Sequence, residues 1–210
     1  MNFFQAIILG IVQALTEYLP VSSSAHIRII GDLMLGADPG AAFTAIIQIG
    51  TELAVILYFR RDIINILSHW FGCLFGKNGP DWRARMGRGD KYATLGWNVI
   101  VGSIPIIILG FTLQNIIETS LRNLWITVTV LFLFGLLLWI VDARSRQIKT
   151  MDDMNYRDAF LFGLGQSMAL IPGVSRSGGT ITVGRALGYT RESAVRLSFL
   201  MAIPAVFGSG

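Results

Sequence analysis

Two stretches that match each other decide the fold, Val21-Ser22-Ser23-Ser24 and Val174-Ser175-Arg176-Ser177. A shift of 153 residues lays residues 6–31 on residues 159–184 without a gap. The identities fall mainly on glycine, glutamine and serine in a chain dominated by aliphatic residues. They pair Ala6, Gly10, Gln13, Val21, Ser22, Ser24 and Gly31 with Ala159, Gly163, Gln166, Val174, Ser175, Ser177 and Gly184. We interpret this as an internal repeat, the alternative being chance similarity of two apolar segments.

The composition around these stretches is that of a membrane protein. The 210 residues are 53% hydrophobic and 14% charged, where soluble domains have about 25% charged residues. Residues 93–112 and 123–141 are each long enough to cross a hydrocarbon core, which needs about 20 helical residues. Further apolar stretches lie at 3–19, 41–59 and 193–207. The first basic residue is Arg28, so we expect no cleaved signal peptide, and the lone Cys73 allows no intrachain disulfide.

The charges predict an orientation. Basic residues cluster in 60–92 and 142–157, whereas 113–122 has only Arg122 beside Glu118. By the positive-inside rule the first two segments are cytoplasmic loops and the third is outside. The net charge of +4 therefore reports membrane orientation, and we expect no nucleic-acid partner. Between the two loops, residues 93–141 form a helical hairpin.

We expect one all-α integral membrane domain over 1–210, built as a polytopic protein with inverted-topology repeats. Repeat one covers 1–60, and repeat two, which is incomplete, covers 158–210. Each copy reads as helix, polar loop, short helix, turn, helix. The short helix of about 10 residues cannot cross the membrane. We therefore predict two re-entrant helix-loop-helix hairpins, which begin on opposite sides of the membrane and face each other near its midplane.

The first polar loop carries a set of groups that can converge. Gln13 and Glu17 share a helical face, and Pro20 ends that helix. The serines Ser22 to Ser24 suit the N-cap of the next helix, whose free N–H groups form an anion site. His26 falls on the first turn of that helix. This arrangement predicts that Glu17, His26 and the hydroxyls lie together.

The second polar loop surrounds one arginine with hydroxyls. Arg176 has Ser175, Ser177 and Thr180 as neighbours in sequence, and its guanidinium suits phosphate oxygens. Serine and glycine in a membrane helix also serve close packing, which is the structural alternative. Ionisable groups in apolar surroundings favour a functional site. For Glu52, in the 41–59 stretch, a site role and a buried polar contact are equally consistent with the sequence.

These segments resemble the undecaprenyl-diphosphate phosphatase family, also called the bacitracin-resistance phosphatases. The first family motif stands here as Gln13, Glu17 and Pro20-Val-Ser-Ser-Ser-Ala-His26, and the second, Pro-Gly-x-Ser-Arg-Ser-x-x-Thr, stands in full at Pro172 to Thr180. The resemblance covers the whole chain. It implies hydrolysis of undecaprenyl diphosphate to undecaprenyl phosphate and phosphate, in the bacterial cell membrane, at a site that opens to the outer face. The lipid carrier is thereby recycled for cell-wall synthesis.

The resemblance also implies roles. Ser23 is the nucleophile candidate, His26 its base or acid partner, and Arg176 the residue that holds the diphosphate. Glu17, with Gln13, binds a divalent cation, Mg²⁺ or Ca²⁺, or assists proton transfer. The expected partners are a polyprenyl diphosphate, the bilayer and a second copy in a homodimer. Whether serine or a metal-held water attacks stays open. The remaining phosphate-binding candidates are Ser22, Ser24, Ser175, Ser177 and Thr180.

The chain departs from the family pattern at several positions. Many members have Glu where this chain has Gln13, and Ser24 and Ala25 replace the commoner Thr and Gly. The sequence stops at Gly210 inside an expected span, so we expect a C-terminally truncated form of the family chain. A transporter of polyprenyl phosphate that uses the same inverted-repeat site is the main alternative, and a non-catalytic remnant is another. The second lipid-phosphatase superfamily is set aside, because it needs a histidine where Thr182 stands.

Overall fold

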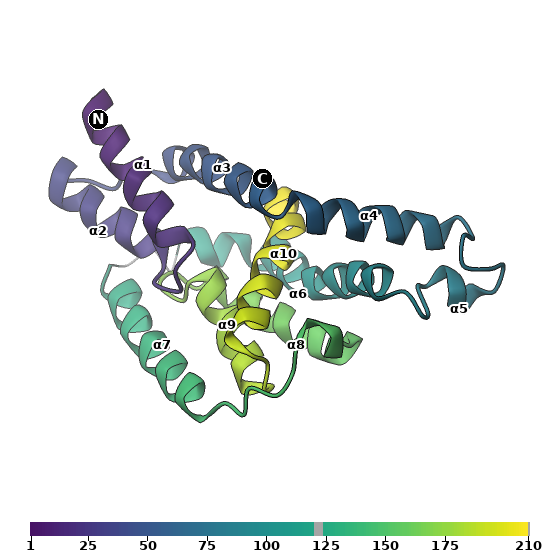
Figure 1. Cartoon of the computed structure of the whole chain (residues 1–210). Helices are drawn as coiled ribbons and strands as arrows, with labels where there is room; N and C mark the ends of the chain where they lie inside the picture. Colours follow the sequence, from purple (N-terminus) through teal and green to yellow (C-terminus); the bar gives the residue numbers. More distant parts are fainter. Residues whose placement is uncertain (120–123, 210) are drawn as a thin grey trace.

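A computed structural model describes residues 1–119 and 124–209, and these residues form helices joined by turns (Figure 1). The all-α prediction is therefore confirmed. Arg122, on which the predicted orientation of 113–122 partly rests, lies outside the described residues, and so does the side chain of Glu118. In chain order the helices are α1 Phe3–Glu17, α2 Ser23–Leu35, α3 Ala41–Tyr58, α4 Arg60–Leu74, α5 Trp82–Arg85, α6 Lys91–Thr119, α7 Leu124–Arg144, a 3-10 turn Met151–Asp153, α8 Tyr156–Ser167, a 3-10 turn Met168–Leu170, α9 Arg176–Ala186 and α10 Arg191–Ser209.

The internal repeat appears as two copies of one local geometry. In each copy a helix, a polar loop and a helix are followed by a turn and a third helix, as α1–α2–α3 and α8–α9–α10. Ser22 caps α2 with φ 63° and Ser175 caps α9 with φ 65°. A non-glycine residue at positive φ is uncommon, so its recurrence at matched positions supports the repeat. The opposite membrane orientation of the copies and their re-entrant path stay predictions.

The membrane character of the chain is carried most clearly by α6 and α7. Within the described residues, Lys91–Leu113 and Leu124–Arg144 are long and apolar enough to span a membrane. A third span is possible by length if α3 and α4 count as one, and these are bent by 71° at their junction. Only 6% of the apolar stretch of α7 is buried inside the protein, and Phe132 and Trp139 are exposed. Such a helix needs lipid around it.

The segment 60–92 differs from the predicted loop, because much of it is helical. In α4, Ile66 and Cys73 are buried, and Trp70 packs edge-on against Trp97 of α6 at 5.2 Å between ring centroids. Figure 1 shows α4 beside the first part of α6, with α5 beyond them. The many basic residues obscured an amphipathic helical period. The predicted loop at 142–157 likewise includes the end of α7 and the start of α8.

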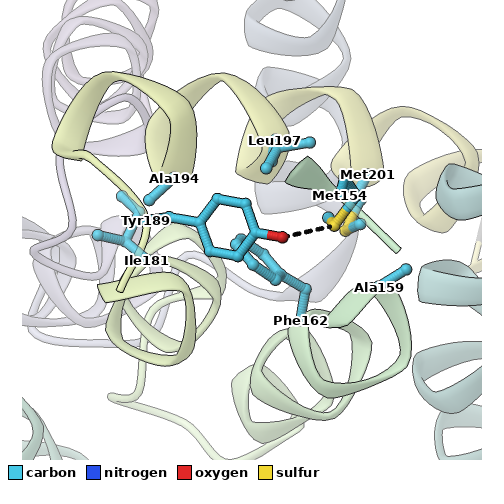
Figure 2. Close-up of a cluster of buried hydrophobic side chains, with 8 residues drawn as sticks. All are labelled: Met154, Ala159, Phe162, Ile181, Tyr189, Ala194, Leu197 and Met201. Atoms are coloured by element: carbon cyan, nitrogen blue, oxygen red, sulfur yellow. Dashed lines mark hydrogen bonds between the residues drawn. The ribbon is translucent and has the colours of Figure 1, made fainter. Parts of the chain in front are cut away.

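The best-packed part of the molecule belongs to repeat two and α6. Figure 2 shows the ring of Tyr189 over that of Phe162, and the two meet edge to face at 5.2 Å. The Tyr189 hydroxyl donates to Asp158 at 2.9 Å, and Lys149 donates to the same carboxylate at 2.8 Å. This cluster fixes α8, α9 and α10 as the frame on which the second polar loop is mounted. Its buried members are Met154, Ala159, Phe162, Ile181, Tyr189, Ala194, Leu197 and Met201.

Two glycine contacts hold α8 against its neighbours. A Cβ atom on Gly163 would collide with the carbonyl oxygen of Gly102 in α6, and one on Gly165 would lie 2.8 Å from the carbonyl oxygen of Gly179 in α9. Gly10, the repeat partner of Gly163, would meet nothing within 4 Å. The two equivalent glycines therefore differ in role. Gly163 allows α8 to pack closely on α6, whereas Gly10 makes no such contact.

This difference gives a matched pair of variants. We expect Gly163→Ala to lower the free energy of unfolding by about 1–3 kcal/mol, the usual cost of overpacking. We expect Gly10→Ala to be neutral or to stabilise by about 0.5–1 kcal/mol through helix propensity. Denaturant titration of the detergent-solubilised protein, followed by circular dichroism, measures both. Equal effects at the two positions would contradict the packing described.

Candidate active site

The two polar loops border one small cavity, with a volume of about 200 Å³. Residues of both repeats and of α6 line it, so the repeats meet here as the matched sequences predicted. The lining residues are Gln13, Glu17, Ser22, Ser23, Ser24, Thr44, Gln48, Ile106, Ala169, Leu170, Ser175, Arg176, Ser177 and Ala205.

In the first loop, Glu17 and Ser23 are brought together by the break between α1 and α2. Helix α1 ends at Glu17, and α2 begins at Ser23 after a turn that contains Pro20. The Ser23 hydroxyl donates to Glu17 Oε2 at 2.5 Å, and Gln13 Nε2 donates to the same oxygen at 3.0 Å. The predicted neighbours Gln13, Glu17 and Ser23 therefore form one chain of hydrogen bonds.

In the second loop, Arg176 reaches across to repeat one. It is the first residue of α9, and its Nη2 donates to Glu17 Oε1 at 2.6 Å and to Glu52 Oε1 at 2.5 Å. The side chains of Arg176, Glu17 and Glu52 are 17%, 10% and 8% exposed, respectively. A second contact joins the loops directly, since Ser177 Oγ donates to the Leu19 carbonyl at 3.4 Å. One guanidinium thus joins α9 to both α1 and α3.

The remaining serine side chains form hydrogen bonds within their own loops. Ser22 Oγ accepts from the Ala25 N–H at 3.4 Å and lies 3.2 Å from Ser24 Oγ. Ser175 Oγ accepts from the Gly178 N–H at 3.2 Å and lies 3.2 Å from Ser177 Oγ. Each loop therefore presents the start of a helix to the cavity, capped by a serine. Two helix N-termini at one cavity favour an anion with more than one charged group.

Two predicted site residues lie apart from this group. His26 Nδ1 is 2.9 Å from the Ser22 carbonyl oxygen, which can only accept, so this nitrogen carries the proton. The ring lines a different cavity beside α7, with Leu131 among its neighbours. Thr180 is fully buried, and its hydroxyl donates to the Arg176 carbonyl at 2.7 Å. The Ser23 hydroxyl thus contacts Glu17 and not His26. The Thr180 hydroxyl bonds the backbone of α9 itself and does not line the cavity.

Glu52 is a site residue that the sequence left undecided. It is 6% exposed and shares Arg176 with Glu17. Tyr18, which follows Glu17, donates through its hydroxyl to the Thr51 carbonyl at 3.1 Å and so fixes α1 against α3 at this level. The signal in the sequence was an acidic residue inside an apolar stretch, with no motif to say what it faces.

The oxygen atoms of the site suit a hard divalent cation. Gln13 is 1% exposed, and its Oε1 has no hydrogen-bond partner within the described residues. The nitrogen of the same amide donates to Glu17, and the carboxylates of Glu17 and Glu52 share Arg176. No group of three His, Cys, Asp or Glu side chains that could hold a metal occurs in the described part of the chain. Mg²⁺ commonly has only one or two carboxylate ligands and completes its shell with water and substrate phosphates.

The arrangement has the parts of a phosphoryl-transfer site. A serine hydroxyl is paired with a carboxylate that can accept its proton. An arginine and two helix starts can neutralise phosphate oxygens. Phosphoryl transfer needs mainly positioning and charge stabilisation, and both are present here.

Comparison with known proteins agrees with this chemistry. The family described as bacitracin resistance protein BacA matches residues 6–210. An undecaprenyl-diphosphatase of Bifidobacterium longum subsp. infantis is 90% identical over 210 residues, which is 100% of this chain and 71% of the relative. Proteins of the same name from Bifidobacterium adolescentis and Paenarthrobacter aurescens are 73% and 56% identical, and all of this chain matches 71% and 73% of their lengths.

The shared arginine gives a testable coupling. We expect Arg176→Met to lower the free energy of unfolding by about 3 kcal/mol, because it leaves the buried carboxylates of Glu17 and Glu52 without their shared cation. Adding Glu52→Gln should recover about 1 kcal/mol, since one of those charges is then removed. Denaturation of the single and double variants in detergent measures the coupling. Strictly additive losses would show that Glu52 and Arg176 do not interact.

Proposed function

The chain belongs to the bacitracin resistance protein BacA family, and we propose that it hydrolyses undecaprenyl diphosphate to undecaprenyl phosphate and inorganic phosphate. It is a membrane-embedded hydrolase of a bacterial family. The product is the lipid carrier on which cell-wall precursors are assembled, so the activity returns the carrier to wall synthesis. The names of the relatives support the substrate, and the contact of Ser23, Glu17 and Arg176 supports the chemistry.

We propose that Ser23 is the nucleophile. Its oxygen attacks the terminal phosphorus, its proton passes to Glu17, and the bond from that phosphorus to the bridging oxygen breaks. Undecaprenyl phosphate leaves with that oxygen, and a phosphoryl group stays on Ser23. The protonated Glu17 gives this proton up as undecaprenyl phosphate departs. Water then attacks the phosphoserine, Glu17 takes a proton from the water and passes it to Ser23 Oγ as the bond from phosphorus to that oxygen breaks, and inorganic phosphate is released. The 2.5 Å hydrogen bond from Ser23 to Glu17 is the single observation that carries this assignment.

Arg176 has to exchange partners for this reaction. In the structure its Nη2 contacts Glu17 and Glu52. A diphosphate that enters the cavity offers more negative charge, so the guanidinium turns to the phosphate oxygens and leaves Glu17 free to accept a proton. The helix starts at Ser22 and Ser175 are placed to take one phosphate group each, and this pairing suits a diphosphate better than a monophosphate.

We propose that a divalent cation binds at the same oxygen atoms. Glu17, Glu52 and the unpaired Oε1 of Gln13 would hold it together with the phosphates. When bound, it would neutralise charge on the diphosphate. Gln13 and the cation, instead of Arg176, would then orient Glu17. Oε2 of Glu17 would stay directed toward Ser23.

We place the protein in the bacterial plasma membrane as a multi-pass chain, with the cavity open to the outer side. The basic segments 60–92 and 142–157 support this orientation through the positive-inside rule. On α3 the cavity is lined by Thr44 and Gln48, and α3 ends at Tyr58, just before Arg60 and Arg61 of α4. The cavity and the basic residues thus lie toward opposite ends of this helix. A homodimer stays a prediction.

The first test replaces the paired residues. We expect Ser23→Ala and Glu17→Gln to lower phosphate release from undecaprenyl diphosphate in liposomes by at least about a thousandfold, the range of nucleophile and base removal. His26→Gln should have a smaller effect, because the ring contacts the backbone of the loop. Thr16→Ala is the control on α1, since its hydroxyl bonds only the Val12 carbonyl. Turnover close to wild type in Ser23→Ala would favour attack by water.

The second test concerns the cation. We expect a chelator to abolish phosphate release and added Mg²⁺ or Ca²⁺ to restore it. Gln13→Glu adds a carboxylate one helical turn from Glu17, so half-maximal activity should need a lower cation concentration. Activity that is indifferent to chelation, or an unchanged cation requirement in Gln13→Glu, would argue against this oxygen set.

A further inference from the structure

A second, larger hollow lies on the same helices as the site. Helices α3 and α10 are in contact (Figure 1). Residues of both helices line a groove of about 880 Å³. Its apolar lining comes from Tyr18, Ala54, Val55, Tyr58, Phe59, Val195 and Phe199. We name this the α3–α10 groove.

The groove begins where the site cavity ends. Along α3, Gln48 lines the site cavity and Ala54 lines the groove, and along α10 the order is Ala205 and then Phe199. Glu52, with its bond to Arg176, stands between them on α3. Tyr18 lines the groove directly after Glu17 in the chain. A molecule with its charged end at Arg176 therefore has the apolar residues of the groove next along α3 and α10.

The walls of the groove are fixed, and its far end is charged. The rings of Tyr18 and Phe59 both pack on Phe199, at 6.2 Å and 5.9 Å between centroids. At the other end Arg196 donates to both carboxylate oxygens of Asp62 at 3.0 Å. The groove residues of α3, from Ala54 to Tyr58, cover about 6 Å of the helix at about 1.5 Å per residue. Charged side chains also line this end of the groove, so its apolar part is short. They are Arg61, Asp62, Arg191, Glu192 and Arg196.

We propose that the α3–α10 groove binds the first isoprene units of the substrate chain while Arg176 holds the diphosphate. This rests on the proposed function, and it names the part of the molecule that selects a polyprenyl substrate. An apolar chain gains by leaving water or the headgroup region for this slot. The charged end limits the slot to the first few units, and the rest of the chain runs into the bilayer. Selection therefore depends on the units nearest the diphosphate.

The test fills the groove without touching the site. Ala54 is exposed and lines the groove, so Ala54→Trp places an indole in the slot. Leu57 is 63% exposed on the same helix and does not line the groove, so Leu57→Trp is the matched control. The probes are farnesyl diphosphate, with three isoprene units, and isopentenyl diphosphate, with one. Phosphate release by the 210-residue chain in detergent gives kcat/KM for each.

We expect Ala54→Trp to lower the farnesyl-to-isopentenyl ratio of kcat/KM at least tenfold, mainly through KM for farnesyl diphosphate, and Leu57→Trp to leave the ratio unchanged. An unchanged ratio in Ala54→Trp would overturn the groove assignment. Failure of the wild-type chain to release phosphate from either probe would instead remove the proposed function.

A second measurement does not depend on turnover. A farnesyl diphosphate analogue with a benzophenone at the end of its chain is photolysed with the wild-type protein, and the adducts are mapped by mass spectrometry. We expect adducts on residues 54–59 and 195–199, reduced at least fivefold by excess undecaprenyl phosphate and by Ala54→Trp. Adducts confined to other helices would overturn the proposal.

Discussion

One buried guanidinium holds the two halves of this protein together at the site. Arg176 begins α9 in repeat two, and its Nη2 is bonded to Glu17 of α1 and Glu52 of α3 in repeat one. Two carboxylates this close would repel each other and lose hydration if the arginine were absent. The arginine is tolerable at this depth for the same reason, because the carboxylates neutralise it. The position of each loop therefore depends on a charge that the other loop carries.

The repeats share a backbone and differ in chemistry because they are packed differently. Both loops are capped by a serine at positive φ, and both begin a helix at the cavity. Repeat two sits in the core, where Gly179 occupies the position equivalent to His26 and must be a glycine because it abuts Gly165. Repeat one is less tightly enclosed, so it can carry large polar side chains. The catalytic groups on one copy and the phosphate-binding arginine on the other follow from this asymmetry.

Local sequence predicted the features that depend on backbone and spacing. The repeat, the serine caps and the meeting of Glu17 and Ser23 could be derived, because cap geometry and helical period are set by nearby residues. The contact of Arg176 with Glu17 joins residues far apart in the chain and needed the tertiary structure. Helix α4 was not predicted, because the many basic residues of 60–92 are typical of a cytoplasmic loop. Only the packing of Trp70 against Trp97 shows that this helix lies on α6. The direction of the His26 ring also could not be derived, because spacing gives the face of a helix and not the rotamer.

Glu52 shows a different limit, since its partner lies 124 residues away and only the tertiary structure brings them together. The central claim is that the arginine of one repeat serves the nucleophile of the other. Phosphate release from undecaprenyl diphosphate in liposomes, compared between the wild-type chain and Arg176→Ala, tests it most directly. The account predicts release by the wild type and a loss of at least about a thousandfold in the variant, which should still insert into the membrane. Comparable release by both would contradict it.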